Sequence, residues 1–145
     1  MKTFASHSTD ETRQIAAAFV QELKAPALIR LHGDLGAGKT CFVQGMAEAL
    51  GWDRAVTSPT YGLVQEFTTQ PPFIHADLYR LTHPNEIWEL GLDEWMEEDA
   101  LIAVEWSERV PDFWPAEAWQ VELTATAGAE NSRQIRIWQG DVNAG

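Results

Sequence analysis

The sequence predicts an α/β fold: a single domain with a mixed sheet flanked by helices and an antiparallel pair of strands near its C-terminus. Two short apolar runs, residues 27–31 and 100–104, have the length and composition of buried strands. The first is followed by a glycine-rich loop and a helical pattern, the order of a strand–loop–helix unit. Residues 120–124 and 133–138 alternate apolar and polar side chains, which indicates two strands that each bury one face.

Helix and turn signals place the other elements. A capping box at residues 8–11 opens a helix that runs to about residue 23, and Pro26 breaks the pattern. A second helix begins at Lys39 and stops at Gly51, a residue type that suits a helix C-terminus. The remaining expected elements are a hairpin of strands at 62–67 and 73–78, short helical pieces at 85–90 and 93–98, and a frayed tail beyond about residue 140.

Length and composition limit the class of protein. The chain has 145 residues, 45% of them hydrophobic, which suits one domain over residues 1–145 with a core of its own. A single cysteine, Cys41, excludes an internal disulfide or a cysteine-based zinc site and fits a reducing cytoplasm. The apolar runs are too short to span a bilayer, and no signal-peptide pattern is visible. We therefore expect a cytoplasmic protein that does not engage the membrane.

The net charge of the chain limits the kinds of partner that it can bind. Acidic side chains outnumber basic ones by 22 to 10, so the formal net charge is −12. Phosphate backbones repel such a surface, and we expect no tight binding of nucleic acid by the chain alone. Tryptophans gather between residues 88 and 114, where core packing is the first interpretation and a partner surface the second.

Residues 33–40, Gly33-Asp-Leu-Gly-Ala-Gly-Lys-Thr40, match the P-loop pattern G-x-x-x-x-G-K-[ST] in full. Glycines let backbone N–H groups approach phosphate oxygens, and the N-terminus of the following helix adds partial positive charge. The lysine of this pattern reaches the β- and γ-phosphates, and the hydroxyl after it ligates Mg²⁺. The sequence therefore predicts a site for ATP and Mg²⁺. The expected nucleotide contacts in the loop are Gly36, Ala37, Gly38, Lys39 and Thr40.

A P-loop also needs a carboxylate at the end of a neighbouring strand to hold Mg²⁺ or its waters. Glu105 directly follows a buried apolar run, and Asp77 ends a more polar one. Aspartate is the commoner residue in this role, so the pattern does not choose between them. His75 beside Asp77 is interpreted as structural. Thr60, in the segment after the P-loop helix, is either a sensor of the γ-phosphate or part of a β-turn.

Five segments occur in order and at suitable spacing, and together they resemble the TsaE family of small bacterial P-loop ATPases, also known as YjeE. They are the P-loop, Ser58-Pro-Thr-Tyr61, His75-Ala-Asp-Leu-Tyr-Arg80, Glu89-Leu-Gly-Leu92 and Val104-Glu-Trp106. The resemblance implies a role in making N6-threonylcarbamoyladenosine in tRNA, in which ATP hydrolysis resets a complex of the partner proteins TsaD and TsaB. It covers nearly the whole chain.

The resemblance also implies roles for individual residues. Thr40 and Glu105 resemble the family's Mg²⁺ ligands, and Asp77 an essential carboxylate of the catalytic site. Thr60 resembles a switch residue and Trp106 an essential aromatic residue near the site. Thr9 stands where the N-terminal segment of family members approaches the nucleotide, and Cys41 replaces a second threonine that is usual after Thr40. A thiol is a weaker hydrogen-bond donor than a hydroxyl, so we expect softer nucleotide binding.

Two other classes compete with a switch ATPase. A small P-loop kinase that phosphorylates a metabolite is the alternative, although the chain has no insertion long enough for an arginine-bearing lid. A non-hydrolysing binding module is the third class. A GTPase is disfavoured, because the Asn-Lys-x-Asp guanine reader needs a lysine after the P-loop and none follows Lys39.

Overall fold

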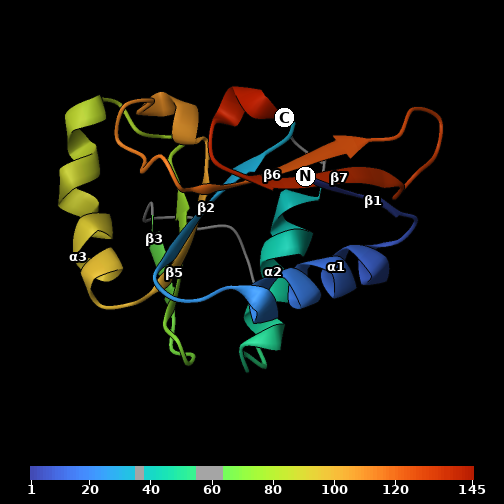
Figure 1. The fold of residues 1–145 in the computed structure, drawn as a ribbon, viewed down its shortest axis with the longest axis horizontal. Helices are drawn as coiled ribbons and strands as arrows, with labels where there is room; N and C mark the ends of the chain where they lie inside the picture. The colour runs from blue at the N-terminus through green and yellow to red at the C-terminus, as the bar shows by residue number, and fades with distance from the viewer. Residues whose placement is uncertain (35–37, 55–63) are drawn as a thin grey trace.

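The computed structural model describes residues 1–34, 38–54 and 64–145 of the chain. In these residues, seven strands form one sheet in the order β1-β7-β6-β2-β5-β4-β3 (Figure 1). The strands are β1 (Lys2–Ser6), β2 (Ala27–His32), β3 (Val64–Phe67), β4 (Phe73–Asp77), β5 (Leu101–Glu105), β6 (Trp119–Ala125) and β7 (Arg133–Gln139). The helices are α1 (Thr9–Glu22), α2 (Lys39–Ala49) and α3 (Leu92–Glu97), with 3₁₀ turns η1 (Pro84–Leu90), η2 (Ser107–Arg109) and η3 (Val142–Ala144).

The sheet is mixed. Its centre is parallel, with β2 between β5 and β6 and with β4 beside β5. The outer strands β3, β7 and β1 are antiparallel to their neighbours. This arrangement confirms the predicted fold class, including the antiparallel pair β6–β7, and the predicted hairpin β3–β4. Because β2, β5 and β4 are parallel, their carboxyl ends meet at one edge of the sheet.

Helices cover both faces of the sheet. On one face α1 and α2 pack over a core that includes Ile29, Phe42 and Val121. On the other face η1 and α3 pack over a second core that includes Ile74 and Val104 (Figure 1). The two helices of the first face approach each other closely at Gly45, where a Cβ atom would lie 2.5 Å from the Arg13 carbonyl oxygen. Only glycine fits at that crossing.

The alternation of side chains along β4 and β5 brings polar groups to the α2 face. Phe73 on β4 and Leu101 and Ala103 on β5 belong to the core beneath α1 and α2. Because side chains two residues apart share a face, His75, Asp77 and Glu105 point to the same side. Polar residues at the carboxyl ends of two neighbouring strands therefore face the N-terminus of α2.

Two parts of the chain differ from the sequence-based expectation or add to it. No element was expected before residue 8, yet Lys2–Ser6 forms the edge strand β1, paired with β7. Lys2, Thr3 and Ala5 are exposed, and Phe4 alone packs against the core, so the strand shows too little hydrophobic pattern to be predicted and depends on main-chain pairing. Beyond residue 140, Val142–Ala144 forms a 3₁₀ turn, and Trp138 Nε1 donates to the Asp141 carbonyl oxygen at 2.9 Å. No helix in the described ranges is long and apolar enough to cross a membrane.

Candidate functional site

The N-terminus of α2 lies at the carboxyl end of the parallel strands. Gly38 caps the helix with φ 100°, a left-handed conformation that favours glycine, and its carbonyl oxygen accepts from Phe42 N at 2.9 Å. The first turn carries no acidic side chain. Its backbone N–H groups and the helix dipole therefore form a site that suits an anion such as a phosphate group. Gly36, Ala37 and Thr60 lie outside the described residues.

Lys39, the first residue of α2, is buried rather than solvated. Its side chain is 7% exposed, and Nζ lies 3.6 Å from Glu105 Oε1. The same nitrogen lies 4.9 Å from the centre of the Trp106 ring. The lysine thus rests on two consecutive residues at the end of β5, which is the strand beside β2. Three of the residues predicted for the site are brought together here.

Glu105 is a buried carboxylate with two different neighbours. Oε1 faces Lys39, and Oε2 lies 2.6 Å from His75 Nε2. Burial alone would raise the pKa of Glu105, but the hydrogen bond from His75 and the charges of His75 and Lys39 outweigh it. The pKa is therefore lowered from its ordinary value of 4.5. The group is an ionised oxygen donor at neutral pH, which is the type of ligand that Mg²⁺ prefers.

Asp77, the other predicted carboxylate, ends β4 opposite Glu105 in the parallel register. It is half-buried, and its Oδ1 accepts from Tyr79 N at 3.0 Å. Among the described residues, the carboxylate that pairs with Lys39 is that of Glu105. The structure therefore places Glu105 beside the lysine and Asp77 one strand further from the end of β2.

Trp106 adopts an unusual backbone conformation, with φ 59° and ψ 36°. A left-handed conformation is rare for a bulky residue and marks a position that its surroundings fix. The Trp106 ring contacts Tyr79, with ring centres 5.1 Å apart, and the Arg109 guanidinium lies 5.9 Å from its centre. The indole thus lies within reach of two cations, Arg109 and Lys39, next to the buried carboxylate.

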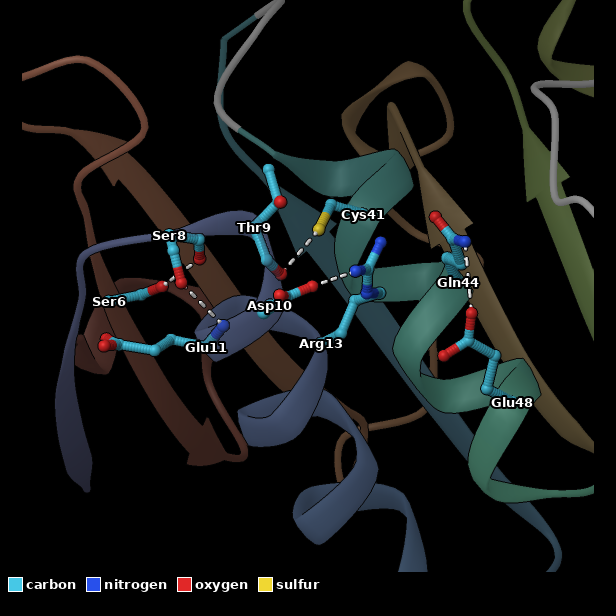
Figure 2. Close-up of polar contacts among 9 residues, drawn as sticks. All are labelled: Ser6, Ser8, Thr9, Asp10, Glu11, Arg13, Cys41, Gln44 and Glu48. Atoms are coloured by element: carbon cyan, nitrogen blue, oxygen red, sulfur yellow. Dashed lines mark hydrogen bonds and ion pairs between the residues drawn. The ribbon is translucent and has the colours of Figure 1, made fainter.

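Thr9 and Cys41 connect the first turns of the two helices on this face. Cys41 Sγ donates to the Thr9 carbonyl oxygen at 3.2 Å, as Figure 2 shows. Arg13 and Asp10 form an ion pair beside this contact (Figure 2). Burial raises the pKa of the Cys41 thiol, so it is protonated at neutral pH. The start of α1 is thereby held against the first turn of α2.

Two further residues lie near the site. His75, which the sequence indicates as structural, is fully buried on the same face of β4 as Asp77. Arg133 begins β7, and its Nε lies 3.6 Å from where a Cβ of Gly38 would stand. No local pattern predicts this second approach, because it depends on the pairing of β7 with β6 and of β6 with β2.

The described residues fit a metal that a bound ligand helps to hold. No group of three or more His, Cys, Asp or Glu side chains in the described ranges could bind a metal ion by itself. Mg²⁺ at nucleotide sites is held by one or two protein oxygens together with phosphates and waters. Thr40 in the first turn of α2 and the ionised Glu105 are oxygen donors of that kind.

The cavities of the described residues differ in chemistry. One of about 390 Å³ is lined by Gly33, Asp34, Lys39 and Trp106 among others, at the end of β2. A larger groove of about 1150 Å³, between α1 and the strands β1 and β7, has a mostly apolar lining and includes none of the predicted site residues. Two of the predicted site residues, Lys39 and Trp106, thus line the smaller cavity.

Comparison with known proteins agrees with this geometry. The sequence profile described as "Threonylcarbamoyl adenosine biosynthesis protein TsaE" matches residues 6–135. The chain belongs to the TsaE family. It is 38% identical over 133 residues to the tRNA threonylcarbamoyladenosine biosynthesis protein TsaE of Nostoc, an alignment that covers 88% of this chain and 80% of the relative. The TsaE protein of Treponema pallidum is 30% identical over 132 residues, which is 91% of this chain and 96% of that one.

A solved structure has the same fold as this TsaE family member. The crystal structure of YdiB from Bacillus subtilis superposes with a TM-score of 0.79 and 29% sequence identity, covering 99% of this chain and 87% of that one. The TsaE protein of Bacillus subtilis is 38% identical over 115 residues, which is 79% of this chain and 72% of that one. The structural likeness thus covers the sheet and the helices.

Proposed function

We propose that this chain is a Mg²⁺-dependent ATPase that supports the formation of N6-threonylcarbamoyladenosine in tRNA, in the cytoplasm. The observation that carries the proposal is the buried pair of Lys39 and Glu105 at the N-terminus of α2. A cation and an ionised carboxylate at a helix N-terminus are what a nucleotide triphosphate and its metal require. Membership of the TsaE family, which is described by threonylcarbamoyl adenosine biosynthesis, supports the proposed role in tRNA modification.

The residues of α2 would bind the phosphates. Backbone N–H groups of the first turn donate to phosphate oxygens, and Lys39 exchanges Glu105 for the β- and γ-phosphates. Thr40 and Glu105 would hold Mg²⁺, which would supply positive charge to neutralise the phosphates. Thr9 and Cys41 border the same turn and would lie near the remainder of the nucleotide. The contacts of Lys39 with Glu105 and of Cys41 with Thr9 support this division of roles.

Asp77 and Trp106 would act at the edge of the site. Asp77 lies one strand beyond Glu105, where a carboxylate can orient the attacking water or a water of the metal. Trp106 covers Lys39 and would shield the charges from solvent, which strengthens their interaction with phosphate. Thr60 is proposed, on the resemblance of its segment, to sense the γ-phosphate.

The partners we propose are TsaD and TsaB, rather than tRNA itself. The net charge of −12 opposes tRNA binding. Two large aromatic side chains among the described residues are exposed, Tyr79 by 50% and Trp88 by 63%. Tyr79 contacts Trp106, and Trp88 contacts Phe113 with ring centres 5.1 Å apart. Exposed aromatic side chains are typical of surfaces that bind proteins.

The deciding experiment is the rate of ATP hydrolysis by the chain alone and with TsaD and TsaB added, with and without Mg²⁺. We expect slow or undetectable hydrolysis alone and a Mg²⁺-dependent increase with the partners. Hydrolysis that stays absent with both partners present would contradict the proposal. Phosphate transfer to a metabolite would support the kinase alternative instead.

A gel shift with tRNA at physiological salt, beside a pull-down on TsaD and TsaB, tests the choice of partner. We expect no submicromolar tRNA complex of the lone chain and retention on the proteins that differs between ATP and ADP. Tight tRNA binding by the chain alone, or retention indifferent to the nucleotide, would contradict the choice.

A further inference from the structure

His75 lies beneath the candidate site without reaching its surface. It is fully buried on β4, with 0% of its surface exposed. In the register of β4 and β5 it stands opposite Ala103, so Glu105 is its diagonal neighbour two residues further along β5. Long side chains reach each other across that diagonal. Among the described residues, Glu105 therefore connects His75 to a ligand at the N-terminus of α2.

The hydrogen bond between the two side chains has a defined direction. A carboxylate that holds a metal ion is ionised, and an ionised carboxylate only accepts hydrogen bonds. His75 Nε2 therefore carries the hydrogen and donates to Glu105 Oε2 across 2.6 Å. His75 Nδ1 is buried and has no hydrogen-bond partner among the described residues. Among the described residues, the hydrogen bond of the His75 ring is therefore the one to Glu105.

The contact fixes which carboxylate oxygen faces the site. With Oε2 held from below by His75, Oε1 is turned toward Lys39, 3.6 Å from Nζ. The carboxylate rotates only if it breaks the lower hydrogen bond. A glutamate at a strand end without such a partner has several side-chain conformations available, and it would lose that freedom on binding a metal.

Core packing alone does not account for a histidine here. Phe73, two residues earlier on the same face, fills the neighbouring core with an apolar ring. A histidine in such surroundings leaves Nδ1 buried without a partner in the described residues, a cost that an apolar ring avoids. The polar ring is explained if its contact with Glu105 serves the site.

We propose that His75 is a positioning residue that orients Glu105 for a divalent cation held with the nucleotide. The inference rests on the proposed function, because it assigns Glu105 to the metal. Histidine and carboxylate groups that orient metal ligands from behind commonly alter metal affinity by about tenfold or more when replaced. His75 therefore affects the metal more than the nucleotide.

The test compares three variants of His75. In His75→Gln the side-chain NH₂ stands the same number of bonds from Cα as Nε2, so it can still donate to Glu105. In His75→Asn the NH₂ is one bond shorter and falls short of the carboxylate. His75→Phe keeps the ring shape without a donor. Thr69→Val is the matched control, since it removes a buried hydroxyl, which donates to the Pro71 carbonyl oxygen at 2.9 Å, at the other end of β4.

Two measurements separate positioning from packing. The first is Mn²⁺ binding to the complex with a non-hydrolysable ATP analogue, followed by loss of the free-ion electron paramagnetic resonance signal. The second is the affinity for the same analogue in EDTA. For His75→Phe and His75→Asn we expect Mn²⁺ affinity lower by about tenfold or more, with analogue affinity in EDTA changed less than about twofold. His75→Gln should lie within about threefold of the unaltered chain, and Thr69→Val should match it while unfolding at lower temperature.

The outcomes distinguish the inference from the function on which it rests. If the unaltered chain binds no Mn²⁺ with the analogue, both are overturned. If it does and the His75 variants match it, or if metal and analogue affinities fall together, the positioning role alone is overturned. If His75→Phe does not fold, the Gln and Asn variants decide, because both are polar and only Gln reaches Glu105. Equal Mn²⁺ affinities in that pair would overturn the inference.

Discussion

Lys39 Nζ lies 3.6 Å from Glu105 Oε1, and both side chains are less than one-tenth exposed. Each charge is costly to bury unless the other compensates it. Under the proposed function, a phosphate group at the N-terminus of α2 would compete with Glu105 for the lysine, and a metal ion would compete with the lysine for Glu105. Binding of either competitor would release the partner charge for the other. The pair would therefore couple the binding of phosphate to the binding of metal.

Replacing Lys39 with alanine should abolish ATP hydrolysis, with a loss of at least about a hundredfold. The variant lacks the cation that neutralises the β- and γ-phosphates. Lys24→Ala is the control, because this lysine is exposed and lies outside the site. Rates are compared in the presence of the partner proteins. Near-normal turnover of Lys39→Ala would remove the assignment of residues 33–40 to phosphate binding.

Glu105→Gln should reduce Mg²⁺-dependent hydrolysis more than it reduces ATP binding. The amide keeps the shape of the side chain and loses the charge that attracts the metal. Hydrolysis rates are measured across a Mg²⁺ titration and ATP affinity is measured separately, with Asp77→Asn assayed in parallel. Unchanged hydrolysis in Glu105→Gln, with a loss in Asp77→Asn, would transfer the metal role to Asp77.

The structure explains why the sequence could not choose between these two carboxylates. The pattern of an apolar run that ends in an acid is satisfied by both Asp77 and Glu105. The choice depends on the strand order β2-β5-β4, which places the end of β5 directly beside the end of β2. Strand order is a property of long-range pairing, and no local pattern in one sequence reports it.

Local signals did predict the elements that carry the site. Helix α2 begins at Lys39, where the glycine-rich loop and the apolar spacing predict it. The buried central strands β2 and β5 lie where apolar runs predict them. The features that the sequence does not predict depend on contacts between residues far apart in the sequence. The edge strand β1 forms by pairing with β7, and the contact of His75 with Glu105 joins residues 30 apart.

The pKa of Glu105 leads to a prediction about stability against pH. Because the folded-state pKa is lowered, the ionised carboxylate contributes stability above its ordinary value of 4.5, and that contribution is lost as the pH falls through the lower folded-state value. The free energy of unfolding of the unaltered chain should therefore fall more steeply than that of Glu105→Gln below about pH 4.5. Urea unfolding from pH 7 to pH 3 measures this. Parallel curves for the two proteins would contradict it.

Replacing Cys41 with threonine should tighten ATP binding. The thiol donates to the Thr9 carbonyl oxygen at 3.2 Å and its pKa is raised by burial, so it is a neutral, weak donor at neutral pH. A threonine hydroxyl at this position donates more strongly, either to Thr9 or to a bound phosphate. One neutral hydrogen bond is worth about 0.5–1.5 kcal/mol, so we expect affinity higher by about two- to tenfold.

Three variants at position 41 separate the hydroxyl from the shape of the side chain. Cys41→Thr and Cys41→Ser both supply a hydroxyl and should both bind ATP more tightly. Cys41→Ala removes the hydrogen bond between the first turns of α1 and α2 and should bind ATP more weakly. Calorimetric titration with ATP gives the affinities, and the hydrolysis rate at saturating ATP should stay the same in Cys41→Thr, because the thiol lies apart from the contact of Lys39 with Glu105. Binding by Cys41→Thr that equals or falls below that of the unaltered chain would show that the donor at this position does not limit nucleotide affinity.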